Sequence, residues 1–148
     1  MYDQIMLTEN SPAPAWQSQD QNGKAISSAD YAGKWLLLYF YPKDDTPGCT
    51  LEACGFRDSY ASLKDRIAIV GVSADSTDSH QAFIQKFQLP FALIADTEHS
   101  LIQTFGADGV TFPKRTTFLI DSDNIIRKIY HGFDAKDHAA VISKDLDI

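Results

Sequence analysis

The sequence predicts an α/β fold with a mixed central sheet, and three observations lead to that prediction. Short apolar runs typical of buried strands alternate with segments whose apolar residues have helical spacing. The last two apolar runs are separated only by the polar residues 121–124, which predicts an antiparallel hairpin. The 148 residues, 44% of them hydrophobic and 22% charged, suffice for one core and are few for two. We therefore expect one domain spanning residues 1–148.

The first expected elements lie before residue 65. The polar run 17–24 suggests a small N-terminal hairpin that turns at Asn22-Gly23. Residues 35–41, which read Trp-Leu-Leu-Leu-Tyr-Phe-Tyr, are short and apolar, as a buried strand would be. Residues 50–64 carry apolar side chains at helical spacing, so a helix is expected to follow that strand after a loop.

The remainder of the chain continues the alternation. Strands are predicted over residues 67–72, 91–95, 116–120 and 125–130. Helices are predicted over 76–87, 98–105 and 134–146, the first capped by Ser76 or Thr77 and the second stopped by Gly106. The order of these elements matches a thioredoxin-like fold, with the sheet flanked by helices.

Composition argues against several classes of function. The formal net charge is −7 and no lysine- or arginine-rich run occurs, so nucleic acid and anionic membranes are poor partners. The longest apolar run has seven residues, whereas a membrane helix needs roughly 20. The N-terminus lacks the basic and apolar stretches of a secretory signal, and we expect a cytoplasmic protein. In that setting two cysteines are more often buried or reactive thiols than a structural disulfide.

The segment Pro42-Lys-Asp-Asp-Thr-Pro-Gly-Cys49 is the most informative part of the chain. It joins the predicted strand to the predicted helix and places Cys49 in the first helical turn or just before it. Free backbone N–H groups and the helix dipole favour a thiolate at that position. Pro42 stiffens the loop, and Thr46 could direct its hydroxyl at the sulfur or at a bound oxygen. We therefore expect a nucleophilic thiolate that meets a small electrophile.

The second cysteine, Cys54, lies five residues after Cys49. On an ideal helix this spacing puts the Cα atoms about 8–9 Å apart, whereas a disulfide needs roughly 4.4–6.8 Å. If the two cysteines pair, the helical turn between them must unwind. A disulfide that forms transiently during turnover fits such a position better than a structural one.

The sequence around the two cysteines resembles the peroxiredoxin family, most closely its Q type, the bacterioferritin comigratory proteins. The family pattern Pro-x-x-x-Thr/Ser-x-x-Cys falls on Pro42, Thr46 and Cys49, and the Q-type Cys-x-x-x-x-Cys spacing falls on Cys49 and Cys54. Three later segments are also similar to the family, so that the resemblance spans nearly the whole chain: Leu89-Pro-Phe91, Ala95-Asp-Thr-Glu-His99 and Arg115-Thr-Thr-Phe-Leu-Ile-Asp121.

The resemblance implies a thiol peroxidase that reduces hydrogen peroxide and organic hydroperoxides. It implies that Cys49 is the peroxidatic cysteine and forms a sulfenic acid, that Cys54 is the resolving cysteine, and that Arg115 is the active-site arginine. Glu52, one turn after Cys49, could orient Arg115. The implied reductant is thioredoxin or a glutaredoxin, and the implied assembly is a monomer, with a dimer possible.

Other interpretations of the sequence remain open. A redox sensor or relay, which passes its disulfide to a partner protein, needs the same reactive thiolate. A non-catalytic binding module with a thioredoxin-like fold would need none. No metal or other cofactor is expected, since the four histidines, at 80, 99, 131 and 138, lack metal-ligand spacing. The pattern predicts solvated positions for these histidines and a solvated loop for Asp44-Asp45.

Overall fold

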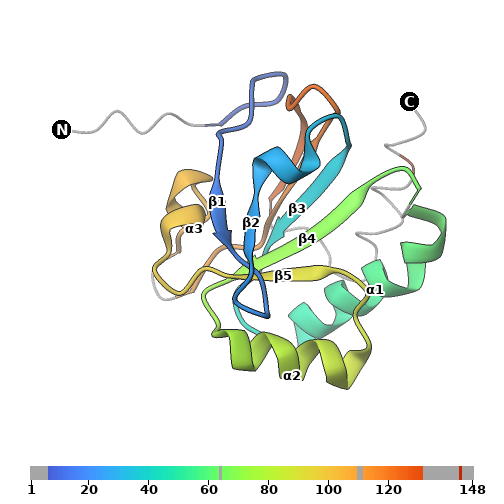
Figure 1. The fold of residues 1–148 in the computed structure, drawn as a ribbon, viewed down its shortest axis with the longest axis vertical. Coiled ribbons are helices and arrows are strands. Elements are labelled where there is room, and N and C mark those ends of the chain that lie inside the picture. The colour runs from blue at the N-terminus through green and yellow to red at the C-terminus, as the bar shows by residue number, and fades with distance from the viewer. Residues whose placement is uncertain (1–6, 64, 110–111, 132–143, 145–148) are drawn as a thin grey trace.

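The computed structural model describes residues 7–63, 65–109, 112–131 and 144. In chain order its elements are β1 (Gln17–Gln19), β2 (Ala25–Ser27), the 3-10 helix η1 (Ser28–Tyr31), β3 (Leu36–Phe40), α1 (Pro47–Leu63), β4 (Ala68–Ser73), α2 (Thr77–Phe87), β5 (Ala92–Ala95), α3 (Ser100–Thr104), β6 (Thr116–Ile120) and β7 (Ile126–His131). Figure 1 shows their arrangement.

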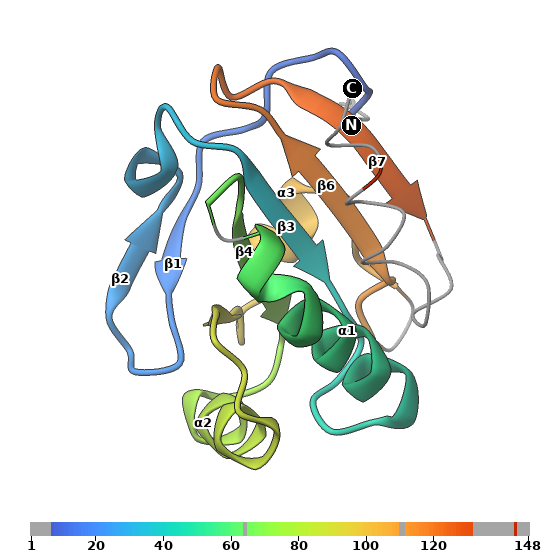
Figure 2. The same ribbon diagram turned by 90° about the vertical axis from the view of Figure 1, so that its right-hand side faces the viewer.

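The five longer strands form one mixed sheet in the order β5-β4-β3-β6-β7. Strands β3, β4 and β5 are parallel, and β6 and β7 are antiparallel to their neighbours. Strands β1 and β2 form a separate antiparallel hairpin beside this sheet, as Figure 2 shows. The predicted α/β fold, with a mixed sheet, flanking helices and an N-terminal hairpin, is confirmed.

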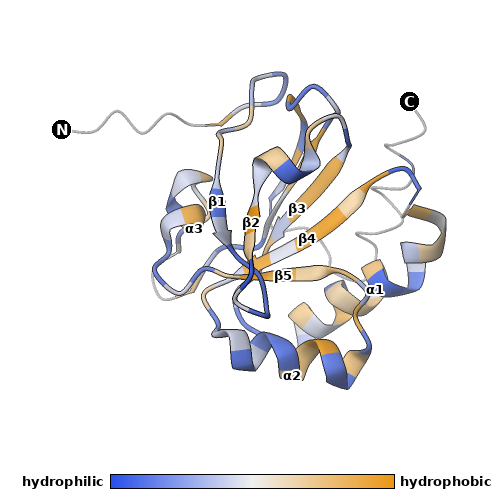
Figure 3. Cartoon of the chain, viewed as in Figure 1, coloured by the Kyte–Doolittle hydropathy of each residue, from blue (hydrophilic) through white to orange (hydrophobic). Residues whose placement is uncertain are grey.

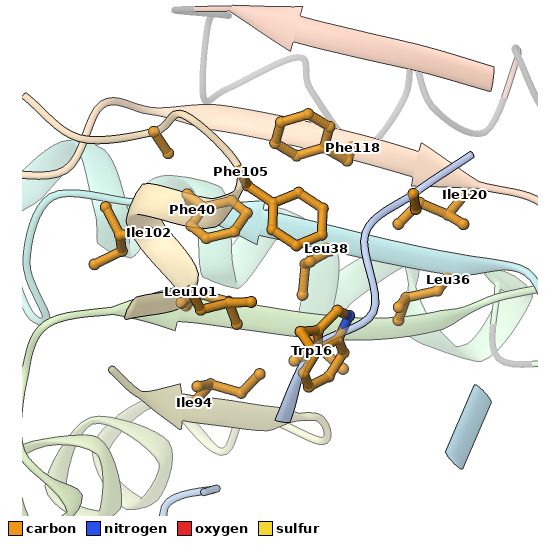
Figure 4. Packing of buried hydrophobic residues seen from close by; sticks show 14 of the residues in the cluster. Trp16, Leu36, Leu38, Phe40, Ile94, Leu101, Ile102, Phe105, Phe118 and Ile120 are labelled. Atoms are coloured by element: carbon orange, nitrogen blue, oxygen red, sulfur yellow. The ribbon is translucent and has the colours of Figure 1, made fainter. Parts of the chain in front are cut away.

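Alternation along β3 divides the core into two layers. Leu37 and Tyr39 face one cluster, which includes side chains of α1 and α2. Leu36 and Leu38 face a second cluster, which includes Trp16 and side chains of α3; Figure 4 shows this packing. Both faces of the central strands are therefore covered. Accordingly, the central strands are largely hydrophobic in Figure 3, whereas hydrophilic and hydrophobic residues alternate along α2.

The predicted elements agree with the observed ones to within a few residues at each end. The helix predicted over 98–105 is shorter and begins at Ser100, where Asp96, directly after β5, accepts hydrogen bonds from the N–H groups of Leu101 and Ile102. The helix predicted over 134–146 lies outside the described residues, apart from residue 144. Within the described part of the chain, every helix is too short or too polar to span a membrane.

Gly71 of β4 leaves room for the ring of Tyr39, its neighbour on β3. A Cβ atom at Gly71 would lie 2.8 Å from Tyr39 Cζ and 2.7 Å from Leu93 Cδ2. We predict that Gly71→Ala lowers the free energy of unfolding by about 1–3 kcal/mol, because the added methyl group overpacks a filled core. Urea unfolding would measure this loss, and an unchanged midpoint and slope would contradict the prediction.

Candidate active site

The sheet topology brings the predicted site residues to one edge of the sheet. Strands β3 and β4 are parallel, so the loops that follow them lie at the same edge. Strand β6 runs antiparallel to β3, and Phe40 at the end of β3 is paired with Thr116 at the start of β6. Arg115, directly before β6, is therefore brought to the loop that leads from β3 into α1.

Cys49 is the third residue of α1, and only 1% of its surface is exposed. Arg115 donates from Nη2 to the Cys49 sulfur at 3.3 Å and from Nη1 to Glu52 Oε1 at 2.6 Å. The Glu52 side chain is fully buried. A buried carboxylate thus fixes the guanidinium, and the guanidinium faces the sulfur. This arrangement can stabilise a thiolate at Cys49. It can also stabilise the negative charge as that charge moves from the sulfur to a leaving group.

Burial and nearby charges determine the protonation states of Arg115 and Tyr39. Partial burial alone would lower the pKa of Arg115, but the charges of Glu52 and Cys49, with hydrogen bonds to both, raise it above its ordinary value. Complete burial, and then the charges of Glu52 and Cys49, raise the pKa of Tyr39 well above its ordinary value. Arg115 therefore stays positively charged beside the sulfur, and Tyr39 stays neutral.

Thr46 and Pro42 lie in the loop between β3 and α1. The Thr46 hydroxyl donates to the carbonyl oxygen of Lys43 at 2.9 Å, and the Thr46 carbonyl accepts the first helical bond from the Thr50 N–H at 2.8 Å. The hydroxyl oxygen keeps its lone pairs for a further donor. Pro42 has no backbone N–H, so it adds no strand hydrogen bond where the chain leaves the sheet.

Gly48 leaves the space that Arg115 occupies beside Cys49. A Cβ atom at Gly48 would lie 3.0 Å from Arg115 Nη2, and Arg115 is already held by Glu52. We predict that Gly48→Ala displaces the guanidinium by a few tenths of an ångström and slows oxidation of Cys49 by about fivefold. Stopped-flow oxidation by hydrogen peroxide would measure the rate, and urea unfolding would show that the fold is kept. A wild-type rate would contradict the prediction.

Cys54 lies in the same continuous helix as Cys49, and both cysteines are free. Cys49 is buried, whereas Cys54 is partly exposed. Gly55 follows Cys54 directly within α1, and glycine weakens a helix interior. The structure therefore shows the reduced protein, with an intact helical turn between the two sulfurs.

Two predictions about polar residues near this edge are wrong. His80 of α2 is fully buried, not solvated, and Asp44 is only 7% exposed; its neighbour Asp45 is exposed. His80 lies on the same face of α2 as Phe83, which is buried, and Phe87, which packs against the same hydrophobic cluster. That spacing of three and seven residues is the sequence signal that could have identified His80 as a core residue.

A model of the AhpC/TSA family matches residues 10–129. A Coxiella burnetii protein named putative peroxiredoxin bcp is 41% identical over 139 residues, which cover 88% of this chain and 92% of the relative. A Suaeda salsa protein named peroxiredoxin Q, chloroplastic, is 39% identical over 130 residues. That alignment covers 85% of this chain and 61% of the relative, so this chain spans less than two thirds of that protein.

A solved structure gives the same picture of the fold. The crystal structure of peroxidoxin BcpB from Mycobacterium tuberculosis superposes with a TM-score of 0.88 at 28% identity. The superposition covers 95% of this chain and 97% of that protein.

Proposed function

The chain belongs to the AhpC/TSA family as a peroxiredoxin, a thiol peroxidase, and from that premise we propose that Cys49 reduces hydroperoxides and Cys54 resolves the product. The observation that carries the proposal is the 3.3 Å contact between Arg115 Nη2 and the Cys49 sulfur. Nη1 of the same guanidinium donates to Glu52. A fixed cation beside a buried sulfur is suited to a reaction in which negative charge leaves that sulfur.

In the first step the Cys49 thiolate attacks the terminal oxygen of the hydroperoxide. A sulfur–oxygen bond forms, the oxygen–oxygen bond breaks, and the sulfur becomes a sulfenic acid. The other oxygen leaves with the bonding electrons and takes up a proton, as water or as an alcohol. Arg115 stabilises the charge as it passes from sulfur to the leaving oxygen. Thr46 can accept the peroxide O–H, because its own proton is engaged with Lys43.

In the second step the Cys54 thiolate attacks the sulfenic sulfur, which releases hydroxide and forms the Cys49–Cys54 disulfide. Both residues are part of α1, and an ideal helix keeps their Cα atoms about 8–9 Å apart, beyond the span of a disulfide. The turn must therefore unwind. Gly55 lowers the cost of that unwinding, and capture by Cys54 protects the sulfenic acid from further oxidation.

Thioredoxin or a glutaredoxin then reduces the disulfide by thiol–disulfide exchange. The test is loss of hydrogen peroxide with thioredoxin, thioredoxin reductase and NADPH, and in parallel with a glutaredoxin, glutathione and its reductase. We expect sustained NADPH consumption in one of these systems. A single turnover that then stalls in both would favour the redox relay, and no reaction with peroxide would remove the proposal.

A further inference from the structure

The second polar centre at this edge of the sheet is His80, which the chemistry above does not use. Its side chain is fully buried, with Nδ1 2.7 Å from Asp44 Oδ2 and Nε2 2.9 Å from the carbonyl oxygen of Ile94 on β5. Asp44 belongs to the loop that carries Thr46 and leads to Cys49. One imidazole therefore connects α2, β5 and that loop.

The hydrogen bonds define what His80 must supply. The Ile94 carbonyl can only accept, so Nε2 carries a proton. Asp44 accepts hydrogen bonds from the hydroxyl groups of Tyr41, at 2.5 Å, and Ser79, at 2.9 Å. The third contact of Asp44 is with Nδ1 of His80, at 2.7 Å. Both ring nitrogens of His80 are thus engaged, one with the buried Asp44 side chain and the other with the Ile94 carbonyl.

The backbone of the loop is fixed at the same point. The Asp44 N–H donates to Asp75 Oδ2 at 2.8 Å, and the Ser73 hydroxyl donates to the same oxygen at 2.7 Å. Asp44, Asp75 and His80 hold three ligand-type atoms within 4.8 Å of one another, as a cation site would. Each of the three side chains already has protein hydrogen-bond partners, so the network is satisfied by hydrogen bonds alone.

Asp44 is the one residue of 42–48 whose side chain is buried. It lies two residues before Thr46, and the next residue, Asp45, has a positive φ of 55°. The loop is therefore short, sharply turned and anchored through one side chain. A displacement of Asp44 would therefore also displace Thr46 and the first turn of α1, where Cys49 contacts Arg115.

We propose that His80 is a positioning residue for Cys49, acting through Asp44 to hold the loop in its reactive geometry. This inference rests on the proposed function of Cys49. His80 is not in contact with the sulfur, so its loss should slow the reaction without removing the nucleophile. Misplacing reacting groups by a fraction of an ångström to an ångström reduces rates by up to about a hundredfold, which makes the effect measurable.

Two variants test the two hydrogen bonds of the imidazole separately. His80→Gln keeps a hydrogen-bonding group in reach of Ile94 and removes the contact with Asp44, whereas His80→Asn keeps a hydrogen-bonding group near Asp44 and loses the contact with Ile94. We expect His80→Gln to slow single-turnover oxidation of Cys49 by hydrogen peroxide by about tenfold and His80→Asn by less than threefold. Alkylation of Cys49 by iodoacetamide, in a Cys54→Ser background, should show the same order.

Asp44→Asn supplies the second measurement, because it removes the carboxylate and keeps its shape. We expect its loss of rate to match that of His80→Gln, and the double variant to be no slower than either single one. Lys86→Ala is the control, since it removes an exposed contact of α2 with Asp45 and leaves the contact between His80 and Asp44 in place.

The reverse order, with His80→Asn slow and His80→Gln unaffected, would overturn the proposal, as would additive losses in the double variant. Rate losses that correlate with losses in the free energy of unfolding, and not with loss of the contact with Asp44, would also overturn it. Wild-type protein whose Cys49 does not react with peroxide would remove the proposed function itself, so the two failures are distinguishable.

Discussion

Cys49→Ser is expected to slow consumption of hydrogen peroxide by at least about a thousandfold, the largest effect of any single substitution. A serine hydroxyl is almost entirely protonated at neutral pH and is a far weaker nucleophile toward oxygen than a thiolate. Arg115 and Glu52 would remain in place, but they stabilise charge and donate no electrons. Single-turnover oxidation followed by fluorescence, together with peroxide loss in the coupled assay, would measure the effect.

The control for this prediction is to show that Cys49→Ser keeps the wild-type fold. Cys49 is buried, but serine is close to it in size, so far-UV circular dichroism and the urea midpoint should change little. Cys54→Ser, which leaves Cys49 in place, should react with the first equivalent of peroxide at the wild-type rate. Peroxide consumption that persists in Cys49→Ser at more than a few per cent would assign the chemistry to another residue.

Much of the fold could be predicted because local patterns and the tertiary structure agree. The run before Pro42 is a central strand, apolar on both faces, as its continuous hydrophobicity indicated. Ser76 caps α2 by accepting from the Ser79 N–H, as the sequence suggested. The polar residues 121–124 turn the last hairpin, and Asn124 supplies a positive φ there.

The site was predictable only in part, because its geometry depends on strand pairing. The loop before Cys49 is contiguous in sequence, so its residues were evident from the motif. Arg115 lies 66 residues further on, and only the antiparallel pairing of β6 with β3 brings it to the sulfur. Nothing in the local sequence around Arg115 specifies that pairing; the family resemblance supplied the assignment.

His80 and Asp44 were missed because a polar residue was taken as evidence of solvent. Asp44 and Asp45 are adjacent acidic residues in one turn, and the sequence does not say which of them points inward. The structure decides it through the partners of Asp44: Tyr41 and Ser79 donate to its carboxyl group, and His80 forms a hydrogen bond with it. Such buried networks are determined by tertiary contacts, which propensity and periodicity do not encode.

The second large effect is expected for Cys54→Ser, which should leave the first turnover intact and stop recycling by thioredoxin. Without Cys54 no intramolecular disulfide forms, and the sulfenic acid remains on the buried side chain of Cys49. In the coupled assay we expect a stoichiometric burst of peroxide loss, followed by steady NADPH consumption at least about a hundredfold below wild type. Mass spectrometry should show Cys49 as a sulfenic acid and, with excess peroxide, as a sulfinic acid.

The same variant tests whether disulfide formation unwinds the helix. In wild-type protein, peroxide should reduce amide protection in the first half of α1, since Cys49 and Cys54 cannot pair within an intact turn. In Cys54→Ser the same treatment should leave that protection in place. Equal protection of reduced and oxidised wild-type protein would contradict the unwinding. Unchanged steady-state turnover in the variant would show that Cys54 is not the resolving residue, since the reductant would then act on Cys49 directly.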